Sequence, residues 1–360
     1  MTNYNEKIGR RGPAGRQISP FFHLAALALL LPRVAVAQAT TYEVLYSFKG
    51  SPDGTQPKGA VVIGTDGALY GTTYTGGTSE SGTVFRLTPA TGELWTETVI
   101  HNFSGPDGLY PDAALIFGTE ALYGTTRGGG TGAGTVFELA PPSTAGGNWT
   151  ETVLYAFDYG GFSDHSQDVI PNGPLLMAPG GTLFTTTQGF AYGNSAFPSG
   201  ASVALVPPAS PGGTWTEYKL YTFGFTSGYW VFAGVVSEGG SLFGTTFYGG
   251  DEYCQCGTVY ELTPPATAGT TWTETTIHTF TYTASDGEGP QAALTMGPGG
   301  VLYGTTQSGG TGSCEYGNGP GCGTGFRLTP PATPGGTWTE SVIYSFTGVR
   351  ATEPIRLQVL

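Results

Sequence analysis

Basic residues are scarce in this chain, and so are long apolar runs and helical patterns. The sequence has 13 Lys and Arg against 26 Asp and Glu, a formal net charge of −13 at pH 7. A surface of that sign repels a phosphate backbone, so we expect no nucleic acid partner. After residue 40 no segment is apolar and long enough to span a bilayer, and none shows the i, i+3, i+4 spacing of an amphipathic helix.

Compact catalytic signatures are also missing. The Gly-rich stretches lack the Gly-Lys-Ser/Thr of a phosphate loop, and the sequence has no His-Glu-x-x-His, Gly-x-Ser-x-Gly or Cys-x-x-Cys motif. We therefore predict no catalytic residue and no cofactor, apart from a possible calcium ion. A protein that is not an enzyme is the favoured interpretation.

Glycine and aromatic residues are abundant instead. The 61 Gly, 26 Pro, 20 Tyr and 20 Phe residues are typical of many short strands joined by tight turns. Apolar residues alternate with polar ones in stretches of five to nine. The predicted fold class is all-β.

The first 39 residues have the pattern of a signal peptide. Lys7, Arg10, Arg11 and Arg16 precede an apolar segment at 21–31, and small residues follow at 35–39. Their removal would leave 8 basic and 25 acidic residues, a net charge of −17. We expect a secreted or extracellular protein, with the periplasm as an alternative, and no membrane span in the mature chain.

A repeat of about 55 to 60 residues covers the rest of the chain, 40–360, as one domain. The segment Leu69–Thr73 (Leu-Tyr-Gly-Thr-Thr) recurs at Leu122–Thr126 and Leu302–Thr306, with Phe for Tyr at Leu242–Thr246, and as Leu-Phe-Thr-Thr-Thr at Leu183–Thr187. Each copy is followed by a Gly-Thr-Val-Phe-like segment and by Trp-Thr-Glu. The five repeats span approximately 49–103, 104–157, 158–223, 224–280 and 281–346, and 347–360 is a partial repeat.

Each repeat predicts four antiparallel strands, which is the anatomy of a propeller blade. One such sheet cannot cover both of its faces, so the units must stack and share a core. Tyr42–Phe48 is a further copy of the fourth strand, and Pro354–Leu360 resembles the first strand at Pro57–Val62. The sequence therefore predicts a β-propeller of five blades, or of six if both termini form the last one.

These repeated segments resemble the GloVer tandem repeat of secreted bacterial proteins over roughly residues 41–346. That resemblance implies an extracellular repeat protein and supplies no activity or catalytic residues. Members of the family tend to end in cell-surface sorting signals, and nothing after Phe346 looks like one. A looser similarity to kelch repeats supports the propeller alone.

The four cysteines lie in two loops between the second and third strands. In an exported protein they indicate disulfides, with Cys314–Cys322 as the first choice. A bond between Cys254 and Cys256 would close a very small ring, which makes it either labile or wrong. The spacing fits no standard zinc site.

Residues that recur in every blade are expected to be structural. His101 and His278 occupy a slot that Tyr fills in the other repeats, and Glu97, Glu151, Glu217, Glu274 and Glu340 form a Trp-Thr-Glu series. A catalytic residue has no reason to recur in this way. A calcium-binding ring of carboxylates is the minor alternative.

The third repeat breaks the pattern, which makes it the predicted place for a ligand site. Carboxylates, a histidine and aromatic residues gather there and in the next repeat, and they could stack on a sugar or hold a cation. These candidates are Asp158, Asp164, His165, Asp168, Phe190, Tyr192, Tyr229 and Trp230. A degenerate repeat with a solvated loop is the simpler interpretation.

The favoured function is a non-enzymatic binding or cell-envelope interaction module whose partner is a polysaccharide or an envelope protein. The alternative is an extracellular polysaccharide hydrolase or lyase with Asp158, Asp164, His165 and Asp168 as acid and base groups.

Overall fold

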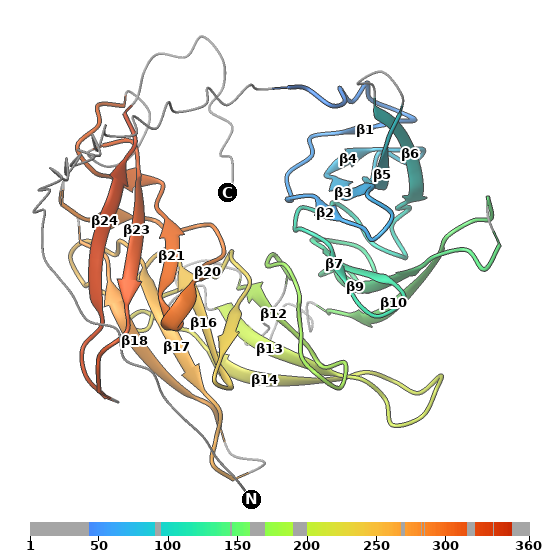
Figure 1. Cartoon of the computed structure of the whole chain (residues 1–360). Coiled ribbons are helices and arrows are strands. Elements are labelled where there is room, and N and C mark those ends of the chain that lie inside the picture. Colours follow the sequence, from blue (N-terminus) through green and yellow to red (C-terminus); the bar gives the residue numbers. More distant parts are fainter. Residues whose placement is uncertain are drawn as a thin grey trace, which may run out of the picture. The chain divides into compact units, whose positions relative to one another are not determined.

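The computed structural model describes residues 43–90, 95–144, 146–158, 170–189, 200–267, 271–281, 283, 285–314, 321–333 and 335–347. The chain divides into two compact units, Met1–Glu43 and Val44–Leu360, and the first lies almost wholly outside these residues, as does the predicted signal peptide. The second unit contains five four-stranded antiparallel sheets, which confirms the all-β propeller (Figure 1).

Each sheet follows the chain in order, so consecutive strands are neighbours. The first blade comprises β2 (Val62–Ile63), β3 (Leu69–Thr73), β5 (Thr83–Pro89) and β6 (Trp95–Asn102). The second comprises β7 (Ile116–Phe117), β8 (Leu122–Thr126), β9 (Thr135–Ala140) and β10 (Thr150–Ala156), and the third β11 (Leu176–Met177), β12 (Leu183–Gln188), β13 (Gly200–Val206) and β14 (Thr216–Thr222).

The fourth blade comprises β15 (Val236–Glu238), β16 (Ser241–Thr246), β17 (Thr258–Thr263) and β18 (Thr273–Thr279). The fifth comprises β20 (Thr295–Met296), β21 (Leu302–Thr305), β23 (Thr324–Thr329) and β24 (Thr339–Ser345). Two-stranded pairs, β1 (Gly54–Thr55) with β4 (Thr75–Gly76) and β19 (Gly287–Glu288) with β22 (Ser308–Gly309), accompany the first and fifth blades, and η1 (Pro298–Gly300) is a single turn.

The core lies between blades, because each sheet buries its faces against its neighbours. Phe103, at the end of β6, packs edge-on against Phe137 of the next blade with ring centroids 5.2 Å apart. Phe280 and Phe326 repeat this contact at the same distance. Four hydrophobic clusters join the five blades in chain order.

The tryptophan of the Trp-Thr-Glu segment adds a second contact between blades. Trp149 packs edge-on against Tyr70 of the preceding blade at 5.9 Å, and Trp338 against Phe243 at 5.8 Å. Figure 1 shows the short first strands, such as β2 and β20, on the inner side of their sheets and the last strands, such as β6 and β24, on the outer side.

The Gly that opens the third strand and the Pro that precedes the first strand form one contact. Gly257 has φ 97°, and a Cβ there would meet the backbone oxygen of Thr246 and the ring of Pro290 in the next blade. Gly82 and Gly134 stand in the same relation to Pro111 and Pro171. Glycine is required because it tolerates positive φ and lets the neighbouring blade approach closely.

Gly257→Ala is therefore expected to lower the free energy of unfolding by about 3 kcal/mol or more, since it combines left-handed strain with a backbone clash. Gly239→Ala is the matched control, because Gly239 also has positive φ but no atom within 4 Å of a Cβ. It should cost only about 1 kcal/mol. Urea unfolding of both variants measures the difference, and equal losses would contradict the proposed contact.

Candidate functional site

The predicted site in the third repeat falls mostly outside the described residues. Asp164, His165, Asp168, Phe190 and Tyr192 are not described. Asp158 is exposed just after β10. Of the eight candidates only Tyr229 and Trp230 are seen together, in a cluster of aromatic rings in the fourth blade.

The last strands of the first and fourth blades each carry a histidine that contacts an aspartate in the loop after the blade. His101 Nε2 lies 3.0 Å from Asp107 Oδ2, and His278 Nε2 lies 3.3 Å from Asp286 Oδ1. Tyr46 fills the same slot before the first blade and donates its hydroxyl to Asp53 at 2.9 Å. The same position on the last strand therefore contacts an aspartate of the following loop in three repeats, which indicates a structural role.

The glutamates of the Trp-Thr-Glu segments are half-buried beside those aspartates. Burial, together with the negative charge of Asp53, raises the pKa of Glu97 to about 7. Burial, together with Asp107, raises the pKa of Glu151 to about 7. Such shifts also mark catalytic acids, but here the arrangement recurs at successive interfaces and belongs to the framework.

A different set of residues varies from blade to blade on a constant backbone. In all five blades the residue at or just after the end of the second strand donates its backbone N–H to a residue that lies a few positions before the first strand. Tyr74 donates to Gln56 in this way, and Arg127 to Tyr110. The acceptor has a positive φ in every blade, for example 54° at Gln56 and 57° at Trp230. We call three residues of each blade the axial positions: the donor, the acceptor and the residue two positions after the acceptor.

The axial positions lie near the centre of the propeller because they flank the first strands, which contact one another between blades. A Cβ on Gly59 would meet the backbone of Ala113 in the next blade, and one on Gly173 would meet Gly234. No chemical type of side chain is common to all five blades at these positions. By blade they are Gln56, Lys58 and Tyr74; Tyr110, Asp112 and Arg127; Ile170, Asn172 and Gln188; Trp230, Phe232 and Phe247; Gly289, Gln291 and Gln307.

Charged and amide side chains join the axial positions of the first three blades. Lys58 Nζ lies 3.2 Å from the centroid of the Tyr74 ring, and Tyr74 stacks on Tyr110 at 5.1 Å. Arg127 Nε lies 3.5 Å from Asp112 Oδ2, and a guanidinium N–H of Arg127 reaches Gln188 Oε1 at 3.5 Å. These contacts form a continuous polar arc across two blade interfaces.

Two oxygens in the polar arc have no partner among the described residues. Asn172 is 8% exposed; its Nδ2 donates to Gln188 at 2.7 Å, but its Oδ1 is unpaired. Asp112 Oδ1 is also buried and unpaired. Burial raises the pKa of Asp112 to about 6, although Arg127 and Lys58 oppose the shift. Unpaired buried oxygens are costly, so they indicate a missing donor such as a ligand or a water molecule.

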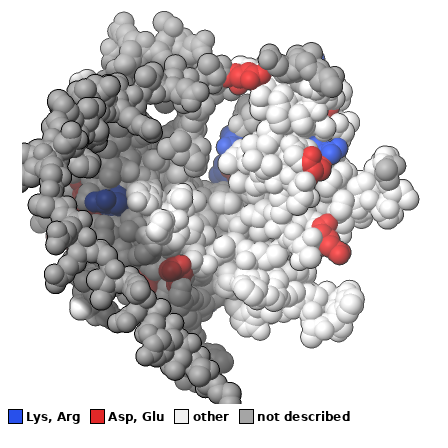
Figure 2. Space-filling view, viewed as in Figure 1, with Lys and Arg blue, Asp and Glu red and all other residues white. Residues whose placement is uncertain are grey.

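Aromatic rings occupy the axial positions of the fourth blade. Trp230 stacks on Phe247 with centroids 6.4 Å apart and lies 5.1 Å from Tyr248. Phe232 packs edge-on against Phe247 at 5.5 Å. Figure 2 shows few charged side chains on the described surface, with Lys or Arg atoms beside the hollow in its middle. Stacking rings and polar groups thus lie at the same level of the propeller.

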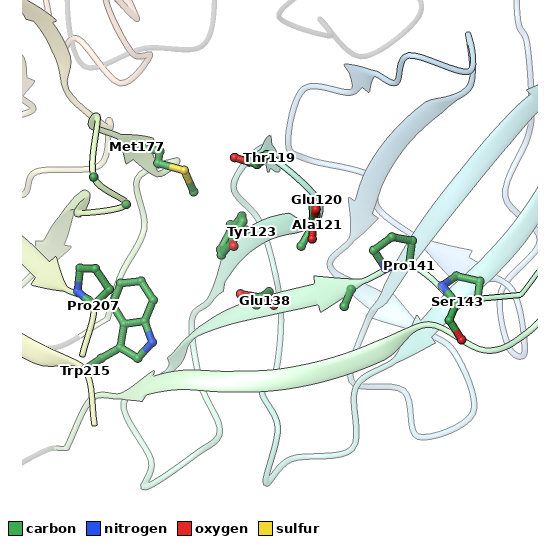
Figure 3. Close-up of a pocket in the computed structure, with 14 residues that line it drawn as sticks. Thr119, Glu120, Ala121, Tyr123, Glu138, Pro141, Ser143, Met177, Pro207 and Trp215 are labelled. Carbon is green, nitrogen blue, oxygen red and sulfur yellow. The ribbon is translucent and has the colours of Figure 1, made fainter. Parts of the chain in front are cut away.

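A separate groove of about 820 Å³ lies between the second and third blades. Figure 3 shows Tyr123 and Glu138 facing Met177 and Trp215 across it. Tyr123 and Trp215 are equivalent to the Tyr70 and Trp149 that pack between blades elsewhere. Because repeated framework residues line it, the groove is the weaker candidate.

Both cysteine pairs, Cys314–Cys322 and Cys254–Cys256, form disulfides, with Cα atoms 5.3 and 5.1 Å apart. The first of these is the pair that the sequence favoured, and Cys256 of the second is buried in the core between the fourth and fifth blades. Within the described residues, no three His, Cys, Asp or Glu side chains group closely enough to hold a metal ion. Calcium binding stays a prediction.

No helix among the described residues is long and apolar enough to cross a membrane. The fold and the repeated contacts define the class: a β-propeller built from tandem repeats. Residues 33–199 match the family model of the Gloeobacter/Verrucomicrobia repeat. Over these residues the match confirms the resemblance drawn from the sequence.

No curated protein matches the chain. Similar solved structures include a protein of unknown function from Dyadobacter fermentans, at 13% identity over 81% of this chain and 83% of that chain, with a TM-score of 0.45. An ulvan lyase bound to -[GlcA(1-4)Rha3S]- shares 10% identity over 82% and 73%, with a TM-score of 0.44. An α-L-arabinofuranosidase from Clostridium thermocellum shares 12% identity over 79% and 93%, with a TM-score of 0.39. TM-scores this low carry no argument about function.

The raised pKa of Glu151 predicts a loss of stability with rising pH. Between about 4.5, the unfolded value, and about 7 the folded state binds more protons, so the free energy of unfolding falls across that window. Glu151→Gln should flatten this fall and gain stability relative to the unmodified protein at pH 8. Thermal unfolding from pH 4 to 8 tests it. The exposed Glu120→Gln is the control, and a Glu151→Gln curve parallel to the unmodified one would refute the assignment.

Proposed function

We propose that this protein is a secreted, non-enzymatic binding module whose axial positions hold an acidic polysaccharide. The observation that carries the proposal is the variation of the axial side chains on a backbone that is the same in all five blades. Repeat proteins keep framework residues constant and place function on variable positions.

The chemistry of the axial positions favours a sugar that bears carboxylates. Trp230 and Tyr110 offer aromatic faces for sugar rings, and Asn172 and Gln188 offer amide hydrogen bonds. Lys58 and Arg127 supply positive charge in a protein with few cations, and guanidinium groups bind carboxylates well. The Arg127 side chain is 31% exposed, so it remains accessible while it pairs with Asp112.

Binding without catalysis is supported by the number of carboxyl groups. Glycoside hydrolysis ordinarily uses a pair of carboxyl groups that flank the scissile bond. Asp112 is the one carboxylate at the axial positions. The alternative of a hydrolase or lyase with Asp158, Asp164, His165 and Asp168 stays a prediction.

Arg127→Gln should weaken binding of oligogalacturonate at least about tenfold, because a charge-assisted hydrogen bond contributes roughly 1.5–3 kcal/mol. Titration calorimetry with the full chain measures this, with carboxyl-reduced oligogalacturonate as the neutral probe. Arg86→Gln is the matched control, since Arg86 pairs with Asp66 on the first blade away from the axial positions. Equal affinity in both variants would refute the site, and release of shortened products would instead favour the enzyme.

Binding should also depend on pH through Asp112. As the pH falls through about 6, Asp112 becomes protonated and leaves the charges of Lys58 and Arg127 uncompensated. Affinity for oligogalacturonate should therefore be higher at pH 5 than at pH 7.5, and Asp112→Asn should remove most of that difference. Measurements at both pH values test this, and an unchanged pH dependence in Asp112→Asn would contradict it.

A further inference from the structure

Within the part of the chain that the structure describes, no strand covers the last strand of the fifth blade. The residue that ends the fourth strand is 0, 2, 1 and 0% exposed at Phe103, Phe157, Phe223 and Phe280, but 38% exposed at Phe346. All five donate their backbone N–H to the Gly that begins or precedes the third strand, so the backbone is the same. Ile343 and Tyr344 beside Phe346 are 54 and 57% exposed.

On its opposite side the first blade exposes an apolar residue that the other blades bury. Val61 is 45% exposed, whereas its equivalents Leu115, Leu175, Val235 and Leu294 are 1 to 6% exposed. An apolar face therefore lies at each end of the run of blades. Each of the four internal interfaces buries the same positions.

The fifth blade cannot close directly on the first, because the receiving position is already filled. Phe85 of the first blade is the equivalent of Phe137, and Phe48 packs edge-on against it with centroids 4.9 Å apart. Phe48 also contacts Tyr46 at 5.2 Å, as Phe346 contacts Tyr344 at 5.1 Å. The segment before the first blade thus acts as the last strand of a preceding blade.

The chain after Phe346 has the spacing of another first strand. Pro354 follows Phe346 by eight residues, as Pro111 follows Phe103. Pro111, Pro171 and Pro290 each pack on a Gly of the preceding blade, and Gly323 holds that position in the fifth blade with φ 96°. Ile355, Leu357 and Val359 then alternate as a strand would.

We propose that Pro354–Leu360 covers the fifth blade as the first strand of a sixth, composite blade, to which Val44–Phe48 contributes the last strand. The inference is independent of the proposed ligand. It explains why both end faces are apolar and why Phe48, rather than Phe346, contacts Phe85. Burial of Phe346 supplies the driving force, as it does for Phe280.

The test compares Phe346→Ala with Phe280→Ala in the full chain by thermal and urea unfolding. If Pro354–Leu360 covers Phe346, both variants should lose stability to a similar extent, and the melting temperature should fall by roughly 6 °C or more. Replacement of 354–360 by Gly and Ser should cause a comparable fall and should make Phe346→Ala nearly neutral in that background.

Exposed Tyr218→Ala, at 55% exposure on β14, is the control for a surface aromatic and should change little. A near-neutral Phe346→Ala in the unaltered chain would overturn the proposal, as would an unchanged melting temperature after the Gly/Ser replacement. Light scattering gives a further outcome. If the protein is a dimer and Tyr344→Asp converts it to monomers, a second copy covers the exposed face of the fifth blade, and the proposal is wrong.

Discussion

The insertion of one blade's terminal phenylalanine against the third strand of the next blade is the contact on which the structure depends. No sheet of four short strands can bury its own faces, so each repeat is stable only with its neighbours. Phe103, Phe157, Phe223 and Phe280 are all nearly inaccessible to solvent. Stability is then a sum of interfaces, and the ends of the run are where an interface is incomplete.

This constraint divides the residues of each repeat into two groups. Those at the interfaces are fixed in kind: the Gly that accepts the neighbouring Pro, the aromatic pair, the Trp, and the half-buried Glu beside an Asp or its equivalent. The axial positions lie outside these contacts and share a backbone hydrogen bond in all five blades. Their side chains therefore differ in kind between blades, as Lys58, Asp112 and Phe232 do at one equivalent position.

The repeat made the strands predictable, because residues that must pack alike recur alike. Leu69–Thr73 and its copies, the Gly-Thr-Val-Phe-like segments and the Trp-Thr-Glu segments all became strands in the expected order. The five four-stranded blades were confirmed, while the composite sixth blade stays a proposal.

Apart from Trp230, the axial positions were not predicted, because the ligand site was expected at the longest departure from the repeat, in 158–168. Tyr74 and Gln56 are far apart in the chain and meet only when the second strand pairs beside the first. A signal was present: the residue after each copy of the Leu69–Thr73 segment differs between most repeats, as Tyr74, Arg127 and Phe247 do. Variation inside an otherwise constant repeat was the better guide, since insertions in surface loops cost little.

Ring closure and ligand binding are linked through the same geometry. Every blade contributes side chains to the axial positions, so the spacing between Lys58 in the first blade and Gln307 in the fifth depends on what joins the two ends. A composite blade would fix that spacing by burying Phe346 and Val61 in one core. A ligand that contacts both ends would in turn favour the closed arrangement, because anything that binds one state preferentially stabilises that state. The weakest interface of the propeller would then be the one that ligand binding strengthens.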